Sequence, residues 1–370
     1  MKVVYLSGTR ADYSLIRRAL IELNFHVDLT ILVTSMHLSP AFGSTFKEIE
    51  KDGFKTKKVD MLIDGDDIGA MVKSFGIGVY GIAQALEDMN PDLVLVEGDR
   101  GESLAMAIVA AHMNIPVVHH GGGDVSGSID NKIRTAITIF SDYHLVGNEE
   151  SYQRLRNLGI SEKRLFIVGE PGLDDISAGD FSPRKEIIDK FNIDANEPLL
   201  VLIQHPDTEK HGNIELEIKE ILNAIQQLQT QTIAIYANAD AGGRKINENL
   251  ESYSQKLPIL SVTKNLSRMD FLGLLNICNA MVGNSSAGLV ELPSFKKPFV
   301  CIGTRQKNRL RAENVIEVDT EKEQIVAGIK KALYDKQFRE KLKTLKNPYG
   351  DGKTSIRIKE IILKILEDNK

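Results

Sequence analysis

The stretch 92–137 constrains the fold more than any other part of the chain, because it repeats one order of elements twice. The short apolar run Leu93–Val96 has the length of a buried strand, and Leu104–Met113 is apolar and long enough for a helix. A second buried strand at Ile115–Val118 and a helix beginning near Asp130 complete the repeat. Short buried strands that alternate with helices are typical of a parallel sheet covered by helices.

Polar and glycine residues follow both of these strands, at the point where each strand ends. In an open α/β sheet, ligands bind at the carboxyl ends of the strands. We therefore expect the side chains in the two loops and in the following helix to converge on one site. These residues are Asp99, Arg100, His119, His120, Asp124, Asp130 and Arg134.

The same alternation continues through both halves of the 370 residues, a length that suggests two domains. We predict an α/β protein with two Rossmann-like parallel-sheet domains that face a cleft. The N-terminal domain, 1–167, carries the acids, and the C-terminal domain, 168–353, is expected to bind the nucleotide. Residues 354–370 form an amphipathic helix, since apolar residues recur at helical spacing from Ile358 to Leu366. The sequence does not tell where this helix docks.

Composition and charge exclude several classes of protein. The net charge of −5 lacks the basic excess expected of a nucleic-acid-binding protein. No apolar run approaches the roughly 18 residues of a membrane span, and the first residues do not resemble a signal peptide. Cys278 and Cys301 both lie in apolar segments, which favours buried thiols in a reducing compartment over a disulfide. We expect a cytoplasmic protein without nucleic-acid or membrane partners.

The loops that follow strands in the second half are small and polar. Ser285 and Ser286 stand at the start of a helix, where hydroxyls and free N–H groups either bind a diphosphate or simply cap the helix. Arg305 after the next strand and Arg10 at the first strand-to-helix turn add cations. Glu291 lies further along the helix and would repel phosphate, so it suits ribose hydroxyls. This set fits a nucleoside diphosphate held between two domains.

The acids of the first half suit proton transfer. Asp99, Asp124 and Asp130 follow two adjacent strands, and His205 would face them from the other domain if the cleft closes. A metal site is a minority interpretation, since the chain has no HExxH or CxxC motif and Arg100 adjoins Asp99. The chain lacks the GxGxxG fingerprint of dinucleotide binding and the GxSxG elbow of a serine hydrolase.

Seven motifs in combination resemble the UDP-N-acetylglucosamine 2-epimerases, particularly the hydrolysing branch that makes N-acetylmannosamine for sialic acid. The resemblance runs from Met1 to about Val315. The motifs are GTRADYS at Gly8–Ser14, GDR at Gly98–Arg100, GG-D-VSGSID-x-x-IR at Gly122–Arg134, QHP at Gln204–Pro206, NADAG at Asn238–Gly242, GNSSAGLVE at Gly283–Glu291 and GTRQ at Gly303–Gln306.

The resemblance implies a two-domain fold shared with GT-B glycosyltransferases, an active site between the domains, and no metal or organic cofactor. It implies removal of the C2 proton with loss of UDP from C1, then addition of water at C1 and reprotonation of C2 on the opposite face. Asp99 and Asp130 are the implied catalytic carboxylates, and His205 assists departure of the diphosphate. The implied substrate-binding residues are Arg10, Asp12, Ser14, Arg100, His119, Arg134, Asn238, Ser285, Ser286, Glu291 and Arg305. Relatives are commonly dimers or tetramers, so a homo-oligomer is expected.

One position departs from the family pattern. Most relatives carry a catalytic Glu two residues after the histidine that matches His119, whereas this chain has Gly121. Either Asp124 or His120 takes over that role, or Gly121 makes room for a larger sugar. A 2,4-diacetamido-2,4,6-trideoxyhexose carried on UDP or GDP is therefore an alternative to UDP-N-acetylglucosamine. A GT-B glycosyltransferase and a non-catalytic nucleotide-sugar sensor remain alternatives from other classes.

Overall fold

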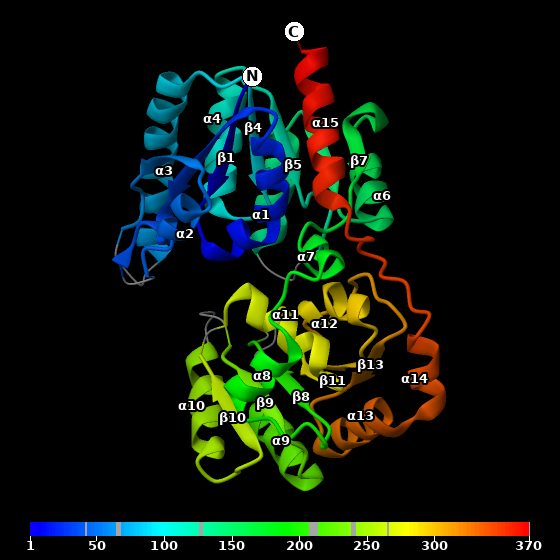
Figure 1. Cartoon of the computed structure of the whole chain (residues 1–370). Coiled ribbons are helices and arrows are strands. Elements are labelled where there is room, and N and C mark those ends of the chain that lie inside the picture. Colours follow the sequence, from blue (N-terminus) through cyan, green and yellow to red (C-terminus); the bar gives the residue numbers. More distant parts are fainter. Residues whose placement is uncertain are drawn as a thin grey trace. The chain divides into compact units, whose positions relative to one another are not determined.

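The computed structural model describes residues 1–40, 43–63, 68–125, 129–206, 214–237, 242–264 and 266–369. The chain divides into two compact units (Figure 1). Unit 1 comprises Met1–Asp174 together with Tyr349–Lys370, and unit 2 comprises Asp175–Pro348. Each unit is built on one parallel sheet with helices, which confirms the predicted α/β class.

The sheet of unit 1 has the strand order β3-β2-β1-β4-β5-β6-β7, and every neighbouring pair is parallel. Its strands are β1 (Lys2–Ser7), β2 (Asp28–Thr34), β3 (Lys55–Val59), β4 (Leu93–Glu97), β5 (Val117–His120), β6 (Tyr143–Val146) and β7 (Leu165–Ile167). The order reverses direction between β1 and β4, and in doubly wound sheets such a switch point is where ligands bind.

Helices cover both faces of this sheet. They are α1 (Arg10–Asn24), α2 (Phe46–Lys51), α3 (Ile68–Met89), α4 (Gly101–His112), α5 (Ile129–Phe140), α6 (Glu149–Asn157) and α15 (Thr354–Asp368), with short 3-10 turns at Ser35–His37 and Glu162–Arg164. The short helix α7 (Leu173–Ala178) contains the division between the units along the chain. One apolar cluster joins alternate strand residues to α1 and α15, and another joins the remaining residues to α3, α4 and α5. The sheet therefore has two distinct buried faces.

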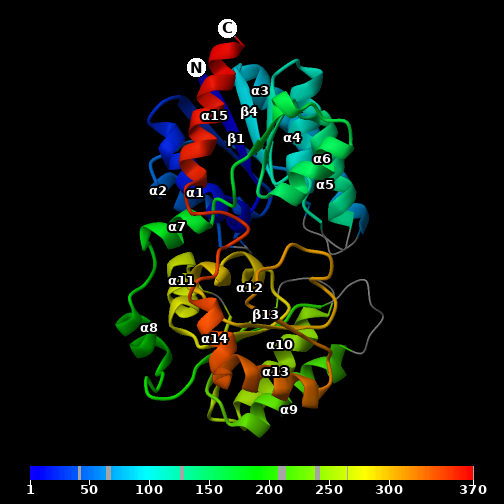
Figure 2. The same ribbon diagram turned by 90° about the vertical axis from the view of Figure 1, so that its right-hand side faces the viewer.

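The C-terminal helix belongs to unit 1. It was predicted from its apolar spacing, and the structure confirms it at Thr354–Asp368. Ile358, Ile362 and Ile365 enter the cluster beneath α1, and Figures 1 and 2 show α15 alongside α1. The buried carboxylate of Asp174 accepts hydrogen bonds from the N–H groups of Thr354 and Ser355, at 2.9 and 2.6 Å. This cap joins residues up to Asp174 to unit 1, so the division lies later in the chain than the predicted boundary at 167/168.

Unit 2 repeats the same layering, with the strand order β10-β9-β8-β11-β12-β13 and parallel pairing throughout. Its strands are β8 (Leu200–Ile203), β9 (Thr232–Ile235), β10 (Leu260–Thr263), β11 (Ala280–Gly283), β12 (Phe299–Ile302) and β13 (Val315–Val318). Its helices are α8 (Arg184–Phe191), α9 (Ile214–Leu228), α10 (Gly243–Ser254), α11 (Arg268–Ile277), α12 (Ala287–Val290), α13 (Lys322–Tyr334) and α14 (Lys336–Leu342), with a 3-10 turn at Leu292–Phe295.

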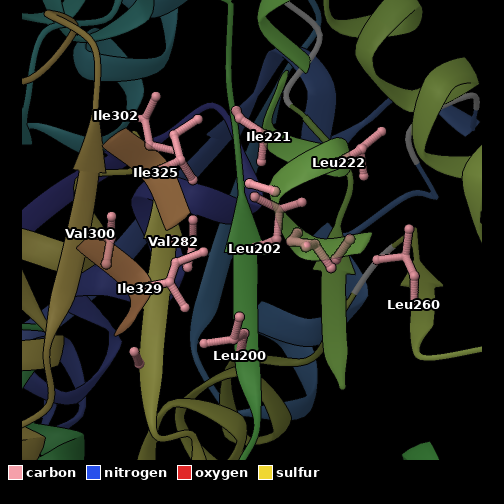
Figure 3. Close-up of a cluster of buried hydrophobic side chains, with 14 of the residues drawn as sticks. Leu200, Leu202, Ile221, Leu222, Leu260, Val282, Val300, Ile302, Ile325 and Ile329 are labelled. Carbon is pink, nitrogen blue, oxygen red and sulfur yellow. The ribbon is translucent and has the colours of Figure 1, made fainter. Parts of the chain in front are cut away.

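The core of unit 2 lies between its sheet and the helices α9 and α13. Figure 3 shows Leu202, Val282 and Val300 from three neighbouring strands pointing toward Ile221 of α9 and Ile329 of α13. All five side chains are fully buried. The sheet is thus held rigidly enough to fix the loops at its carboxyl edge. Among the described residues, no helix is both long and apolar enough to cross a membrane.

Candidate active site

At the carboxyl edge of β4 and β5, a carboxylate and a guanidinium from separate elements lie together. Asp99 follows β4, and Arg134 lies on α5. An Nη2 hydrogen of Arg134 is donated to Oδ2 of Asp99 in a short ion pair. Arg134 is only 8% exposed, so this pair is poorly screened by water. The expected approach of these two residues is thus present in the structure.

The guanidinium of Arg134 has further donors. Its Nη1 lies 3.9 Å from Oδ2 of Asp124. Within the described part of the chain, neither Nε nor Nη1 has a hydrogen-bond partner, although both are buried. Asp130 lies one turn before Arg134 on α5 and is half-buried. Buried donors without acceptors are costly, so an anionic or polar ligand at this edge would be stabilised.

His119 supports the site from below rather than lining it. Its side chain is fully buried, and Nε2 donates to the carbonyl of Gly98 at 2.8 Å. Nδ1 accepts from the hydroxyl of Thr138 at 3.3 Å, which fixes a neutral ring. Burial lowers the pKa of His119 to about 3. His119 would therefore contribute to substrate binding, as predicted, only by holding the loop at Gly98 in place.

His120 is equally buried but carries a charge. Nδ1 lies 2.8 Å from Oε2 of Glu97, and Nε2 lies 3.2 Å from the carbonyl oxygen of Gly169. Because both acceptors lack hydrogens, both ring nitrogens donate. Neither His120 nitrogen reaches the loop edge, so it does not stand in directly for the side chain missing at Gly121. Asp124 is engaged with Arg134.

The first strand-to-helix turn of unit 1 is held by a buried polar cluster. Asp12 accepts from the N–H groups of Gly8 and Thr9, both at 3.0 Å, and from the hydroxyl of Ser7. Burial outweighs these bonds and raises the pKa of Asp12 to about 6. Its carboxylate therefore shapes the turn, and its predicted binding role would be indirect.

This cluster contains a serine, a histidine and an aspartate, but not in the order of a hydrolase. The Ser7 hydroxyl donates to Asp12, so Nε2 of His37, 2.9 Å away, must donate to Ser7. Burial lowers the pKa of His37 to about 4. His37 therefore does not act as a base toward Ser7.

Three more predicted residues lie on helix α1 or at the start of helix α4. Arg10 is the first residue of α1 and pairs with Glu48 at 3.4 Å, and Ser14 follows one turn later. Arg100 precedes α4, is largely exposed, and lies 3.6 Å from Glu102. These cations are accessible for an anionic ligand, since exposed ion pairs hold only weakly.

In unit 2, Asn284 connects the loops after three strands. Its side chain accepts from the N–H of His205 at 2.7 Å and donates to the His205 carbonyl at 2.9 Å. Its own carbonyl accepts from Gln306 at 2.8 Å and from Arg305 at 3.3 Å. Asn284 is 2% exposed. It fixes His205 and Arg305 relative to one another, a role that the sequence did not reveal although the GNSS motif contains it.

The serines that follow Asn284 lie where they were expected. Ser286 precedes the short helix α12 but makes no side-chain capping bond, and Ser285 accepts from the N–H of Ala287 at 3.4 Å. Glu291 is 7% exposed and accepts from Nη1 of Arg268 at 2.9 Å. Arg268 was missed because nothing in its surrounding sequence marks it. A ligand hydroxyl reaching Glu291 would thus meet a carboxylate already oriented by a cation.

The predicted residues thus form two groups, one in each unit. The predicted catalytic acids lie in unit 1, and His205 lies with the diphosphate-binding candidates of unit 2. Asn238 lies outside the described residues, as does the acidic run Asp64–Asp67. In the described parts of the chain, no group of three His, Cys, Asp or Glu side chains could hold a metal ion.

Known proteins of one family match most of this chain. A model of the UDP-N-acetylglucosamine 2-epimerase family matches residues 20–363. UDP-N,N'-diacetylbacillosamine 2-epimerase (hydrolyzing) of Legionella pneumophila is 38% identical over 98% of this chain and 96% of its own length. UDP-N-acetylglucosamine 2-epimerase of Neisseria meningitidis serogroup B is 31% identical over 90% of this chain and 87% of its own.

Solved structures show the same fold. The crystal structure of a Neisseria meningitidis UDP-GlcNAc 2-epimerase bound to UDP-GlcNAc has a TM-score of 0.84, with 21% identity over 98% of this chain and 100% of that one. This likeness supports the predicted GT-B-like class of fold. The family match spans almost the whole chain, and the chain therefore belongs to the UDP-N-acetylglucosamine 2-epimerase family.

Proposed function

We propose that the protein is a hydrolysing nucleotide-sugar 2-epimerase, which converts UDP-N-acetylglucosamine to N-acetylmannosamine and UDP. The observation that carries this proposal is the buried Asp99–Arg134 pair beside Asp124, at the carboxyl edge of the unit 1 sheet. Carboxylates with a fixed cationic partner suit transfer of a weakly acidic proton next to a departing diphosphate.

The reaction proceeds in two balanced stages. A carboxylate takes the C2 proton, the C2–H electron pair forms the C1–C2 double bond, and the C1–O bond breaks with release of UDP. Water then adds its oxygen to C1, and C2 receives a proton on the opposite face. Asp99, Asp124 and Asp130 are the proposed carboxylates for these transfers, and His205 is proposed to assist the leaving diphosphate.

Unit 2 supplies the groups that we propose for the nucleotide. Ser285, Ser286 and Arg305 would bind the diphosphate, and Asn284 holds their loops in register. Glu291, oriented by Arg268, would accept the ribose hydroxyls. Arg10 and Arg100 would supply cations from unit 1. Both preorganised dipoles and fixed cations favour charge that develops on the leaving group.

A second substrate has its own support. The relative from Legionella, named for UDP-N,N'-diacetylbacillosamine, a 2,4-diacetamido-2,4,6-trideoxyglucose, shares 38% identity along 98% of this chain. Gly121 carries no side chain, and a Cβ there would come no closer than 3.5 Å to other atoms. This opening suits a sugar with an additional acetamido group, carried on UDP or GDP.

Proton NMR in deuterated water distinguishes these possibilities. The protein is incubated separately with UDP-N-acetylglucosamine and UDP-N,N'-diacetylbacillosamine, and we expect UDP and a free 2-epimer deuterated at C2. A product still attached to UDP would indicate a non-hydrolysing epimerase, and glycosyl transfer only upon adding an acceptor would indicate a glycosyltransferase. Binding of either substrate without turnover would indicate a sensor.

The variant Asp99→Asn is the matched catalytic control, because it keeps size and polarity but removes the charge. We expect turnover to fall about 10²–10⁴-fold while UDP binding persists. Unchanged turnover would contradict the role given to Asp99. A cytoplasmic location, activity without metal or organic cofactor, and a homo-oligomeric state are proposed together with this function, and gel filtration with light scattering tests the last.

A further inference from the structure

Glu97 and His120 are the last residues of two adjacent strands, β4 and β5, and face each other in the ladder. Parallel neighbours in register place their side chains on the same face of the sheet. Oε2 of Glu97 lies 2.8 Å from Nδ1 of His120. The histidine side chain is fully buried, whereas that of Glu97 is 12% exposed. One oxygen of Glu97 is therefore anchored, and the carboxylate still reaches the surface.

The histidine holds this carboxylate through a charged hydrogen bond. Burial alone would lower the pKa of His120, but the charges of Glu97 and Glu170 outweigh it and raise the pKa to about 9. The carbonyl of Gly169 accepts from the second ring nitrogen. At neutral pH His120 is thus an imidazolium, and Glu97 is its counter-ion. Because each ring nitrogen of the buried His120 donates to its own acceptor, the orientation of the ring is fixed.

The second oxygen, Oε1, borders open space. A Cβ built on Gly121 would lie 3.6 Å from Oε1 and 3.5 Å from the backbone of Gly98. A Cβ built on Gly98 would meet nothing within 4 Å. Both glycines have positive φ, +84° and +70°, in the region that side chains rarely adopt. In the described part of the chain, no hydrogen bond ends on Oε1.

Glu97 and Asp99 flank Gly98 but are held from opposite sides of the sheet. The partner of Glu97 is His120, which alternates with Val118 and so shares its face with the cluster beneath α1 and α15. The partner of Asp99 is Arg134 on α5, a helix that packs on the other face. Two carboxylates, each with a cation behind it, therefore approach one glycine from two directions.

We propose that Glu97 is a catalytic residue that transfers the C2 proton, and that His120 is its positioning residue. This inference rests on the proposed function. Oε2 of Glu97 is held by His120, so Oε1 accepts the proton from C2 while the C2–H electron pair forms the double bond and UDP leaves. C2 then receives a solvent-derived proton through a carboxylate on the Arg134 side, which accounts for inversion.

The proposal is tested with Glu97→Gln, which keeps the volume and the hydrogen bond but cannot accept a proton. Wild type, Glu97→Gln and the control Glu50→Gln, an exposed residue paired with Lys58, are each given UDP-N-acetylglucosamine and UDP-N,N'-diacetylbacillosamine. UDP release, deuterium at C2 and UDP affinity are measured. We expect Glu97→Gln to lose 10²–10⁴-fold in kcat with unchanged UDP affinity, and the control to match wild type.

The variant His120→Gln separates positioning from mere packing. Removing the imidazolium takes a positive charge away from the Glu97 carboxylate, so the acidic limb of the kcat/KM profile should move. Tyr5 and Glu170 also influence this pair and are left unchanged. A uniform loss of activity without a shift of that limb would assign His120 a packing role and would overturn its positioning role.

The possible results distinguish a failure of this inference from a failure of the proposed 2-epimerase function on which it rests. An inactive wild type would overturn the proposed function and this proposal together. An active wild type with Glu97→Gln within twofold of its kcat would overturn only the role of Glu97. Loss of UDP affinity in Glu97→Gln, accompanied by an unmoved profile in His120→Gln, would make the pair structural and would likewise overturn the proposal.

Discussion

The charged state of His120 makes the stability of unit 1 depend on pH in an unusual direction. The pKa of His120 is about 9 in the folded protein, against about 6.5 for a free histidine. The folded state therefore holds its proton more tightly than the unfolded state does. The stabilisation is fully present below pH 6.5 and is lost as the pH rises through 9.

The size of the effect follows from the two pKa values. A shift from 6.5 to about 9 corresponds to about 3 kcal/mol, because each unit is worth about 1.4 kcal/mol. His120 is fully buried, so this energy is not screened by solvent. For a domain the size of unit 1, 1 kcal/mol moves the melting temperature by about 2–4 °C. Between pH 6 and pH 10 we expect the wild type to lose roughly 6–12 °C more than His120→Gln.

Differential scanning calorimetry of the full chain from pH 6 to pH 10 measures this difference. The two proteins share every other titrating group, so subtraction isolates His120. His112→Gln is the matched control, since His112 is exposed at the end of α4, where it contacts the Ile108 carbonyl and the ring of Phe140. The melting temperature of His112→Gln should change with pH by the same amount as that of the wild type. Parallel curves for wild type and His120→Gln would refute the assignment of a buried imidazolium.

Two further substitutions test the geometry of each unit. Arg134→Met keeps the buried stem but leaves Asp99 without its cation, so we expect kcat to fall at least about 10²-fold and the acidic limb of the rate profile to move to higher pH; an unmoved limb would contradict the pairing. Gly283→Ala would place a Cβ 2.0 Å from the Ile203 carbonyl at φ +123°, so we expect a loss of about 2–3 kcal/mol and weaker UDP binding by calorimetry. Gly179→Ala, also at positive φ but with nothing within 4 Å, is the control and should cost only about 1 kcal/mol.

The parts of the fold that the sequence predicts well are those with strong hydrophobic patterns. The central strands are continuous apolar runs, so their place and the parallel class followed directly. Edge strands are only half-buried, and this is why β3, with the sequence Lys-Thr-Lys-Lys-Val, and β13 were not predicted. Helix α3 begins at Ile68, well before the predicted start at Ile77, because its first turns are largely exposed and carry little apolar periodicity.

The sequence predicted the site only where residues with a recognisable chemical role follow the end of a predicted strand. Asp99 and Arg134 were expected to converge because both follow strand ends, and the structure brings them together. Glu97 was predicted only as the first residue of the turn that breaks the strand Leu93–Val96, since its partner His120 lies on a different strand and register is not visible in one sequence. Likewise the bonds of Asn284 to His205 and Gln306 join three loops that are distant along the chain.

The residues around Gly121 indicate which group takes the place of the side chain that most relatives carry at this position. Sequence reasoning offered Asp124 or His120 as a substitute, but Asp124 faces Arg134 and His120 is sealed beneath the sheet edge. The atom that borders the vacant position is instead Oε1 of Glu97, from the neighbouring strand. A histidine at 120 is what makes a carboxylate tolerable there, because an unpaired charge at this depth would be protonated or excluded. The glycine, the glutamate and the histidine therefore form one interdependent unit, and changing any one of them alone should cost more than changing the pair Glu97 and His120 together.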